Sequence, residues 1–92
     1  SGNLVFCEKS LFADDIAEST LAPLIDKTMI NNMGVYIKSH PMAKENRPHI
    51  ELHLTITVNK EDNPDDKLNR AVVELSELIR ESGGKPSSRI QP

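Results

Sequence analysis

Residues 49–58 read HIELHLTITV, and this stretch decides the fold. Every second side chain in it is apolar, at Ile50, Leu52, Leu54, Ile56 and Val58. The side chains between them are polar, at His49, Glu51, His53, Thr55 and Thr57. Alternation with a period of two, in a segment rich in β-branched residues, is typical of a strand that buries one face. We therefore predict a strand at 49–58 with one apolar and one polar face.

A second strand is predicted just upstream, at 35–40, before the polar loop 41–48. An antiparallel hairpin around this loop pairs His40 with His49, Lys38 with Glu51 and Ile37 with Leu52. This register places the apolar side chains of both strands on the same face, and it sets a lysine opposite a glutamate.

Two helices flank the hairpin. The later one has an apolar stripe at Leu68, Ala71, Val72, Leu75, Leu78 and Ile79. Asn63 and Pro64 signal its start, and Gly83 with Gly84 its end. The earlier helix has a stripe at Ala17, Leu21, Leu24, Ile25, Met29 and Met33. Asp15 and Glu18 resemble a capping box, but Pro23 moves the expected start of the regular helix to about Ser19 or Thr20.

With a first strand at 4–12, the element order is β-α-β-β-α. We expect an α+β two-layer sandwich, in which both helices cover one face of a three-stranded mixed sheet and the other face stays open. Residues 4–84 form this domain. We expect residues 1–3 to be a disordered tag remnant and residues 85–92, rich in Pro and Ser, to be a flexible tail or linker.

The composition narrows the function. Eleven Lys and Arg against 14 Asp and Glu give a net charge of −3, which disfavours nonspecific binding to nucleic acid. Aromatic residues make up 3% of the chain, too few for a platform that stacks single-stranded bases. The one cysteine, Cys7, forms no internal disulfide and is expected to be a small core residue. No apolar run is long enough to span a membrane, so we expect a cytoplasmic protein without a membrane partner.

The open sheet face holds the candidate site. Its expected interface residues are Tyr36, Lys38, His40, His49, Glu51 and His53. Three histidines near a carboxylate suggest a metal ion or acid–base chemistry. His49 and His53 lie ~13 Å apart along a strand, however, so only His40 and His49 are expected to approach each other, and two ligands make a weak site. We therefore expect no catalytic and no metal-binding residue.

Three segments together carry a family resemblance: IAESTLAP at 16–23, VYIKSHP at 35–41 and PHIELHLT at 48–55. Their order and spacing over residues 4–84 resemble the C-terminal, KH-like subdomain of the CinA (competence/damage-inducible) family. The resemblance extends to relatives that have a MoCF-type molybdopterin-binding domain.

The resemblance implies a KH-like fold and a longer parent protein that binds molybdopterin or a nucleotide in another domain. It also implies that nucleotide pyrophosphatase and nicotinamide mononucleotide amidase activities belong to other domains. No catalytic residue of the family matches a position in this chain, and this chain itself is expected to hold no cofactor. The GxxG loop by which KH domains clamp nucleic acid is absent.

The resulting expectation is a non-catalytic accessory domain that packs against the remainder of its parent or against a second copy. The first alternative is a KH-like nucleic-acid module that uses Lys38, Lys44 and Arg47. The second alternative is a small metal protein or enzyme that uses His40 and His49.

Overall fold

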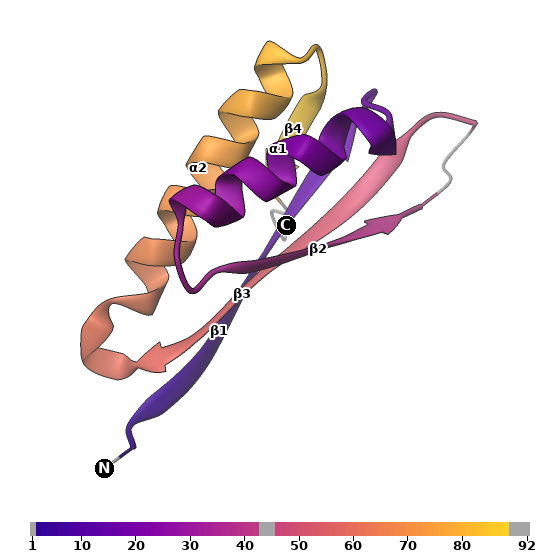
Figure 1. Ribbon diagram of the computed structural model, residues 1–92. Helices are drawn as coiled ribbons and strands as arrows, with labels where there is room; N and C mark the ends of the chain where they lie inside the picture. Colours follow the sequence, from indigo (N-terminus) through magenta and orange to yellow (C-terminus); the bar gives the residue numbers. More distant parts are fainter. Residues whose placement is uncertain (1, 43–45, 89–92) are drawn as a thin grey trace.

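The computed structural model describes residues 2–42 and 46–88. Along the chain these residues form β1 (Leu4–Asp14), α1 (Glu18–Asn31), β2 (Tyr36–Pro41), β3 (His49–Asn59), the 3-10 turn η1 (Lys60–Asp62), α2 (Pro64–Glu81) and β4 (Lys85–Ser88). Both helices lie on the same face of a twisted sheet, as Figure 1 shows. The α+β class and the one-sided cover predicted from the sequence are therefore confirmed.

The sheet has four strands in the order β2-β3-β1-β4, and each neighbouring pair is antiparallel. The predicted three-stranded mixed sheet is wrong on both counts. β1 and β2 do run in the same direction, as the helical crossover requires, but β3 lies between them. The fourth strand comes from Lys85–Ser88, inside the segment expected to be a flexible tail. Its sequence, KPSS, has no apolar alternation, so its pairing with β1 leaves no pattern in the local sequence.

The β2–β3 hairpin differs from the predicted register by two residues. Ile37 lies opposite Leu54 rather than Leu52, and His40 lies opposite Glu51 rather than His49. Since side chains alternate with a period of two, a shift of two keeps every side chain on its predicted face. The apolar pattern therefore determines the face but cannot choose between these registers.

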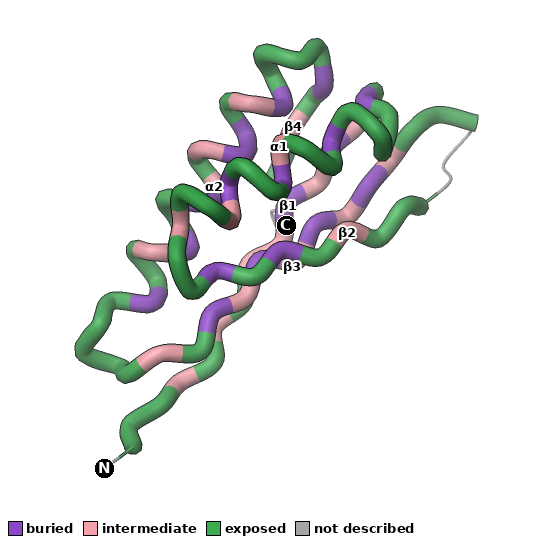
Figure 2. The backbone as a smooth tube through the Cα atoms, in the orientation of Figure 1, coloured by how far each residue is buried: buried purple, intermediate pink, exposed green. Residues whose placement is uncertain are grey.

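The core lies between the sheet and the helices, where Figure 2 shows the buried positions of both layers turned toward each other. β3 supplies the centre of the sheet layer and pairs with β1 over eleven residues. The buried apolar side chains of the strands are Leu11, Ala13, Ile37, Ile50, Leu52, Leu54 and Ile56. Those of the helices are Leu21, Ile25, Leu68, Ala71, Leu75 and Ile79.

α2 begins at Pro64 as predicted, whereas α1 departs from the expectation at both ends. α1 begins at Glu18 after Ala17, and no side chain caps it, so the predicted capping box does not form. Met33 lies beyond the helix with 82% of its surface exposed, although its spacing fits the apolar stripe. Thr28 is buried instead, because its hydroxyl donates a hydrogen bond to the Leu24 carbonyl (2.8 Å) and is thereby satisfied.

Candidate interaction surface

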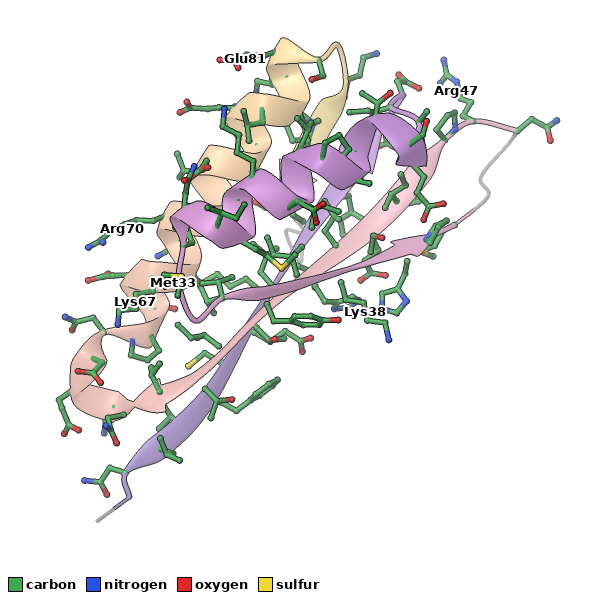
Figure 3. The ribbon with its side chains drawn as sticks, in the orientation of Figure 1. Met33, Lys38, Arg47, Lys67, Arg70 and Glu81 are labelled. Atoms are coloured by element: carbon green, nitrogen blue, oxygen red, sulfur yellow. The ribbon has the colours of Figure 1, made fainter. Side chains whose placement is uncertain are left out.

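The face of the sheet turned away from the helices is the candidate site, and we call it the open face. Alternation along the paired strands assigns its side chains. They are Leu4, Phe6, Glu8, Ser10, Phe12, Asp14, Tyr36, Lys38, His40, His49, Glu51, His53, Thr55 and Thr57. In Figure 3, Lys38 projects from β2 on the side opposite the two helices.

His53 lies at the centre of the open face between two carboxylates. Its Nε2 is 3.5 Å from Oε2 of Glu51 on the same strand. Its Nδ1 is 3.2 Å from Oε2 of Glu8 on β1, yet this buried nitrogen makes no hydrogen bond within residues 2–42 and 46–88. The ring edge of His40 packs against the ring of His53, with the centroids 4.9 Å apart. This cluster joins β2, β3 and β1 through polar side chains.

A second cluster lies toward the hairpin end. Nδ1 of His49 donates a short hydrogen bond of 2.5 Å to Oδ1 of Asp14, the residue directly opposite on β1. The ring of Phe12 stacks on the His49 ring with a centroid distance of 5.4 Å. Next to this cluster, Lys85 of β4 forms an ion pair with Asp15 at 3.3 Å. The orientation of the His49 ring is therefore fixed by side chains of the neighbouring strand β1.

Apolar side chains extend the open face beyond these clusters. Phe6 on β1 is 65% exposed and Tyr36 on β2 is 59% exposed, and Leu4 at the start of β1 is exposed as well. Large exposed rings beside a polar network are a composition found in protein contact surfaces more often than in surfaces that face only water.

The structure places all six predicted interface residues on the open face, but with other neighbours. His40 contacts His53 and lies opposite Glu51, so the predicted pairing of His40 directly opposite His49 is wrong. β1 also contributes to the open face, with Phe6, Glu8, Ser10, Phe12 and Asp14, and this contribution was not predicted. Their alternation is visible in the sequence, but Lys9 interrupts the apolar half of the pattern. Lys9 lies on the helix side, where its Nζ reaches Oδ1 of Asp65 on α2 at 3.1 Å.

No group of three or more His, Cys, Asp and Glu side chains in the described part of the chain could hold a metal ion. Cys7 is half-buried and packs against the core on the helix side of β1, opposite Ile56. No helix among residues 2–42 and 46–88 has the length and hydrophobicity to cross a membrane.

Two of the basic residues predicted to bind nucleic acid are described, and they lie apart from each other. Lys38 lies on the open face and Arg47 lies at the hairpin end, as Figure 3 shows, while Lys44 falls outside the described residues. Three carboxylates, those of Glu8, Asp14 and Glu51, share the open face with Lys38. Such a charge distribution gives phosphates little attraction.

No protein-family model matches the chain. Its relatives include archaeal proteins of greater length. The chain is 31% identical to a protein of Metallosphaera sedula over 86% of this chain and 30% of the relative. For a protein of Saccharolobus solfataricus the figures are 28% identity, 89% of this chain and 30% of the relative. The chain thus spans about three tenths of the length of these curated relatives.

Solved structures identify the fold. The C-terminal segment of the alpha subunit of aIF2 from Pyrococcus abyssi matches 99% of this chain with a TM-score of 0.58 and 14% identity, over 53% of that segment. A protein from Methanopyrus kandleri matches 97% of this chain with a TM-score of 0.55 and 21% identity, over 52% of its own length. A designed protein with a ferredoxin fold matches 91% of this chain and 86% of the design, with a TM-score of 0.51 and 8% identity. The chain is therefore ferredoxin-like rather than KH-like.

Proposed function

We propose that this chain is a non-catalytic interaction domain of a longer protein, and that its open face packs against another domain of that protein. The observation that carries the proposal is the one-sided sheet. The helices cover one face only, while the other combines paired polar side chains with the exposed rings of Phe6 and Tyr36.

The size of the relatives supports a partner within the same polypeptide. About seven tenths of each relative lies outside the matched region, so a further segment is available to cover the open face. The aIF2 alpha subunit offers a parallel at the level of fold alone, because the matched region there is also one part of a longer chain.

The polar clusters suit a contact surface better than an active site. Nδ1 of His49 and both ring nitrogens of His53 already lie near carboxylates. The hydrogen bond between His49 and Asp14 forms before a partner arrives, so excluding water from this pair costs less free energy than desolvating unpaired groups. Nδ1 of His53, by contrast, makes no hydrogen bond within residues 2–42 and 46–88.

A more specific parent, a CinA-like protein with a MoCF-type domain that binds molybdopterin or a nucleotide, has the sequence resemblance as its only support. A Gly/Thr/Asp-rich ligand-binding signature in the parent sequence upstream of this domain would establish it. The domain's role as an interaction module does not depend on this parent.

The test compares side-chain NMR signals, aromatic and methyl, of the isolated chain with those of the longer protein. We expect the Phe6 and Tyr36 signals to shift, while those of exposed residues on α2 stay unchanged. Unchanged Phe6 and Tyr36 signals would refute packing of the open face within the parent. Sedimentation at rising concentration separates this outcome from a second copy of the chain, which would increase the mass.

A further inference from the structure

A groove of about 530 Å³ runs between α1 and the edge strand β2, and Tyr36 of the open face lines its border. Its floor is apolar and consists of Leu21, Ile25, Met29 and Ile37. Two carboxylates, Glu18 and Asp26, line it from α1, and no basic side chain lines it. Figure 1 shows α1 lying along this edge of the sheet.

The edge of β2 presents free backbone groups to the groove. The Met42 N–H donates to the His49 carbonyl at 2.7 Å, which fixes the alternation of the hairpin ladder. By that alternation the N–H groups of Ile37 and Ser39 point away from β3. Pro41 occupies the next outward position and has no N–H. An added strand would therefore pair at Ile37 and Ser39.

The distance between the two carboxylate-bearing residues on α1 matches the distance between side chains on one face of such a strand. Glu18 and Asp26 are eight residues apart on one helix, which corresponds to ~12 Å along its axis. In an extended peptide, side chains four residues apart lie on the same face ~13 Å from each other. A peptide with two basic residues at this spacing places an apolar residue between them, above the floor of the groove.

The same charges disfavour a second copy of the chain as the occupant. Two copies joined through β2 would carry their α1 helices side by side on one face of a continuous sheet. Glu18 and Asp26 of each copy would then approach the same like charges of the other copy, which costs free energy.

We propose that β2 and the adjacent groove bind an extended basic peptide segment as a fifth strand. The segment has the pattern basic–x–apolar–x–basic. Its backbone pairs with Ile37 and Ser39, its apolar side chain enters the groove, and its two basic side chains meet Glu18 and Asp26.

The test titrates the chain with a fluorescein-labelled peptide of sequence Gly-Lys-Thr-Leu-Thr-Lys-Gly. The control peptide carries Glu in place of both Lys. Fluorescence anisotropy gives the affinity, and backbone amide NMR shifts locate the contact. We expect the basic peptide to bind at least about fivefold more tightly than the acidic one. We also expect the largest shifts at the amides of Ile37 and Ser39.

Two variants separate the charge contribution from the strand pairing. The double variant Glu18→Lys with Asp26→Lys is expected to bind the basic peptide about tenfold more weakly than wild type. It is also expected to prefer the acidic peptide to the basic one. The matched control, Glu77→Lys with Glu81→Lys, changes the net charge equally on α2 and should leave affinity unchanged. Ser39→Pro removes an N–H that points away from β3 and leaves the hydrogen bonds between β2 and β3 intact. We expect this variant to lose about fivefold in affinity for the basic peptide. Ser39→Ala, which keeps that N–H, should bind normally.

Three outcomes would overturn the proposal. One is the absence of shifts at Ile37 and Ser39, and another is equal affinity for both peptides. The third is self-association of the free chain that Ser39→Pro abolishes, since a second copy would then occupy the edge. Variants of open-face residues that do not line the groove, such as Phe6→Ser with Lys38→Ser, are expected to leave peptide affinity unchanged, so this result is independent of the function proposed above.

Discussion

Asp14 and His49 face each other across β1 and β3, and their side chains form a short hydrogen bond, with Oδ1 and Nδ1 2.5 Å apart. His49 retains 15% of its side-chain exposure and Asp14 retains 40%. The pair is thus partly shielded from water. It links β1 to β3 on the open face, at the end of the sheet near the β2–β3 loop.

A double-mutant cycle on this pair tests whether the contact stabilises the fold. We expect Asp14→Ala, His49→Ala and the double variant to give a coupling free energy of about 0.5–1 kcal/mol in urea unfolding, the usual range for cross-strand polar pairs. Asp66→Ala on the exposed side of α2 serves as the control and should change stability by less than about 0.5 kcal/mol. If the free-energy changes of the two single variants add up to that of the double variant, the contact contributes nothing to stability.

Leu54→Ala tests the centre of the core. Leu54 is fully buried on β3, opposite Ile37, so its truncation leaves a cavity beneath the helices. We expect a loss of about 2–5 kcal/mol in the free energy of unfolding. Val73→Ala on the exposed side of α2 removes two methyl groups from water and should cost much less. If Leu54→Ala and Val73→Ala lowered the free energy of unfolding equally in chemical denaturation, this would contradict the observed core.

Gly84→Ala tests the close packing at the turn into β4. A Cβ at this position would lie 2.8 Å from Cγ2 of Ile79 and 3.0 Å from Cβ of Ile16, too close for ordinary contact. We expect about 1–3 kcal/mol of destabilisation from this overpacking. Gly2→Ala, with open space around the added methyl group, is the control. A neutral Gly84→Ala in thermal unfolding would place β4 elsewhere.

Removal of β4 tests the fourth strand directly. A chain that ends at Gly84 loses the pairing of Lys85–Ser88 with β1. Each backbone hydrogen bond contributes about 0.5–1.5 kcal/mol, so we expect the shortened chain to lose about 2 kcal/mol relative to a chain that ends at Ser88. If both chains unfold at the same urea concentration, the domain is complete with three strands.

Much of this architecture was predictable from the sequence because apolar periodicity reports which face of an element is buried. The alternation at 49–58 gave β3 and its buried face, and the stripe from Leu68 to Ile79 gave α2. The hairpin register was not predictable, since a slip of two residues keeps Ile37 inside. β4 was not predictable either, because its sequence, KPSS, has no apolar pattern and its pairing partner β1 lies far away in the chain.

The candidate site was half predictable for the same reason. The polar face of β3 and the outer residues of β2 follow from alternation alone. The β1 contribution depends on knowing that β1 lies beside β3, and this long-range pairing brings Glu8 to His53 and Asp14 to His49. The sequence therefore indicated the residues of the open face but not their partners.

The most direct test of the central claim is isothermal titration calorimetry of this domain with the remainder of its longer protein. Wild type is compared with the open-face variant Phe6→Ser plus Lys38→Ser, whose side chains are exposed in the isolated domain and do not line the α1–β2 groove. The matched control is Val73→Ser plus Lys67→Ser on α2. We predict that the open-face variant binds at least about tenfold more weakly while the control binds like wild type. Equal affinity of the open-face variant and wild type would contradict the proposal that the open face is the contact surface.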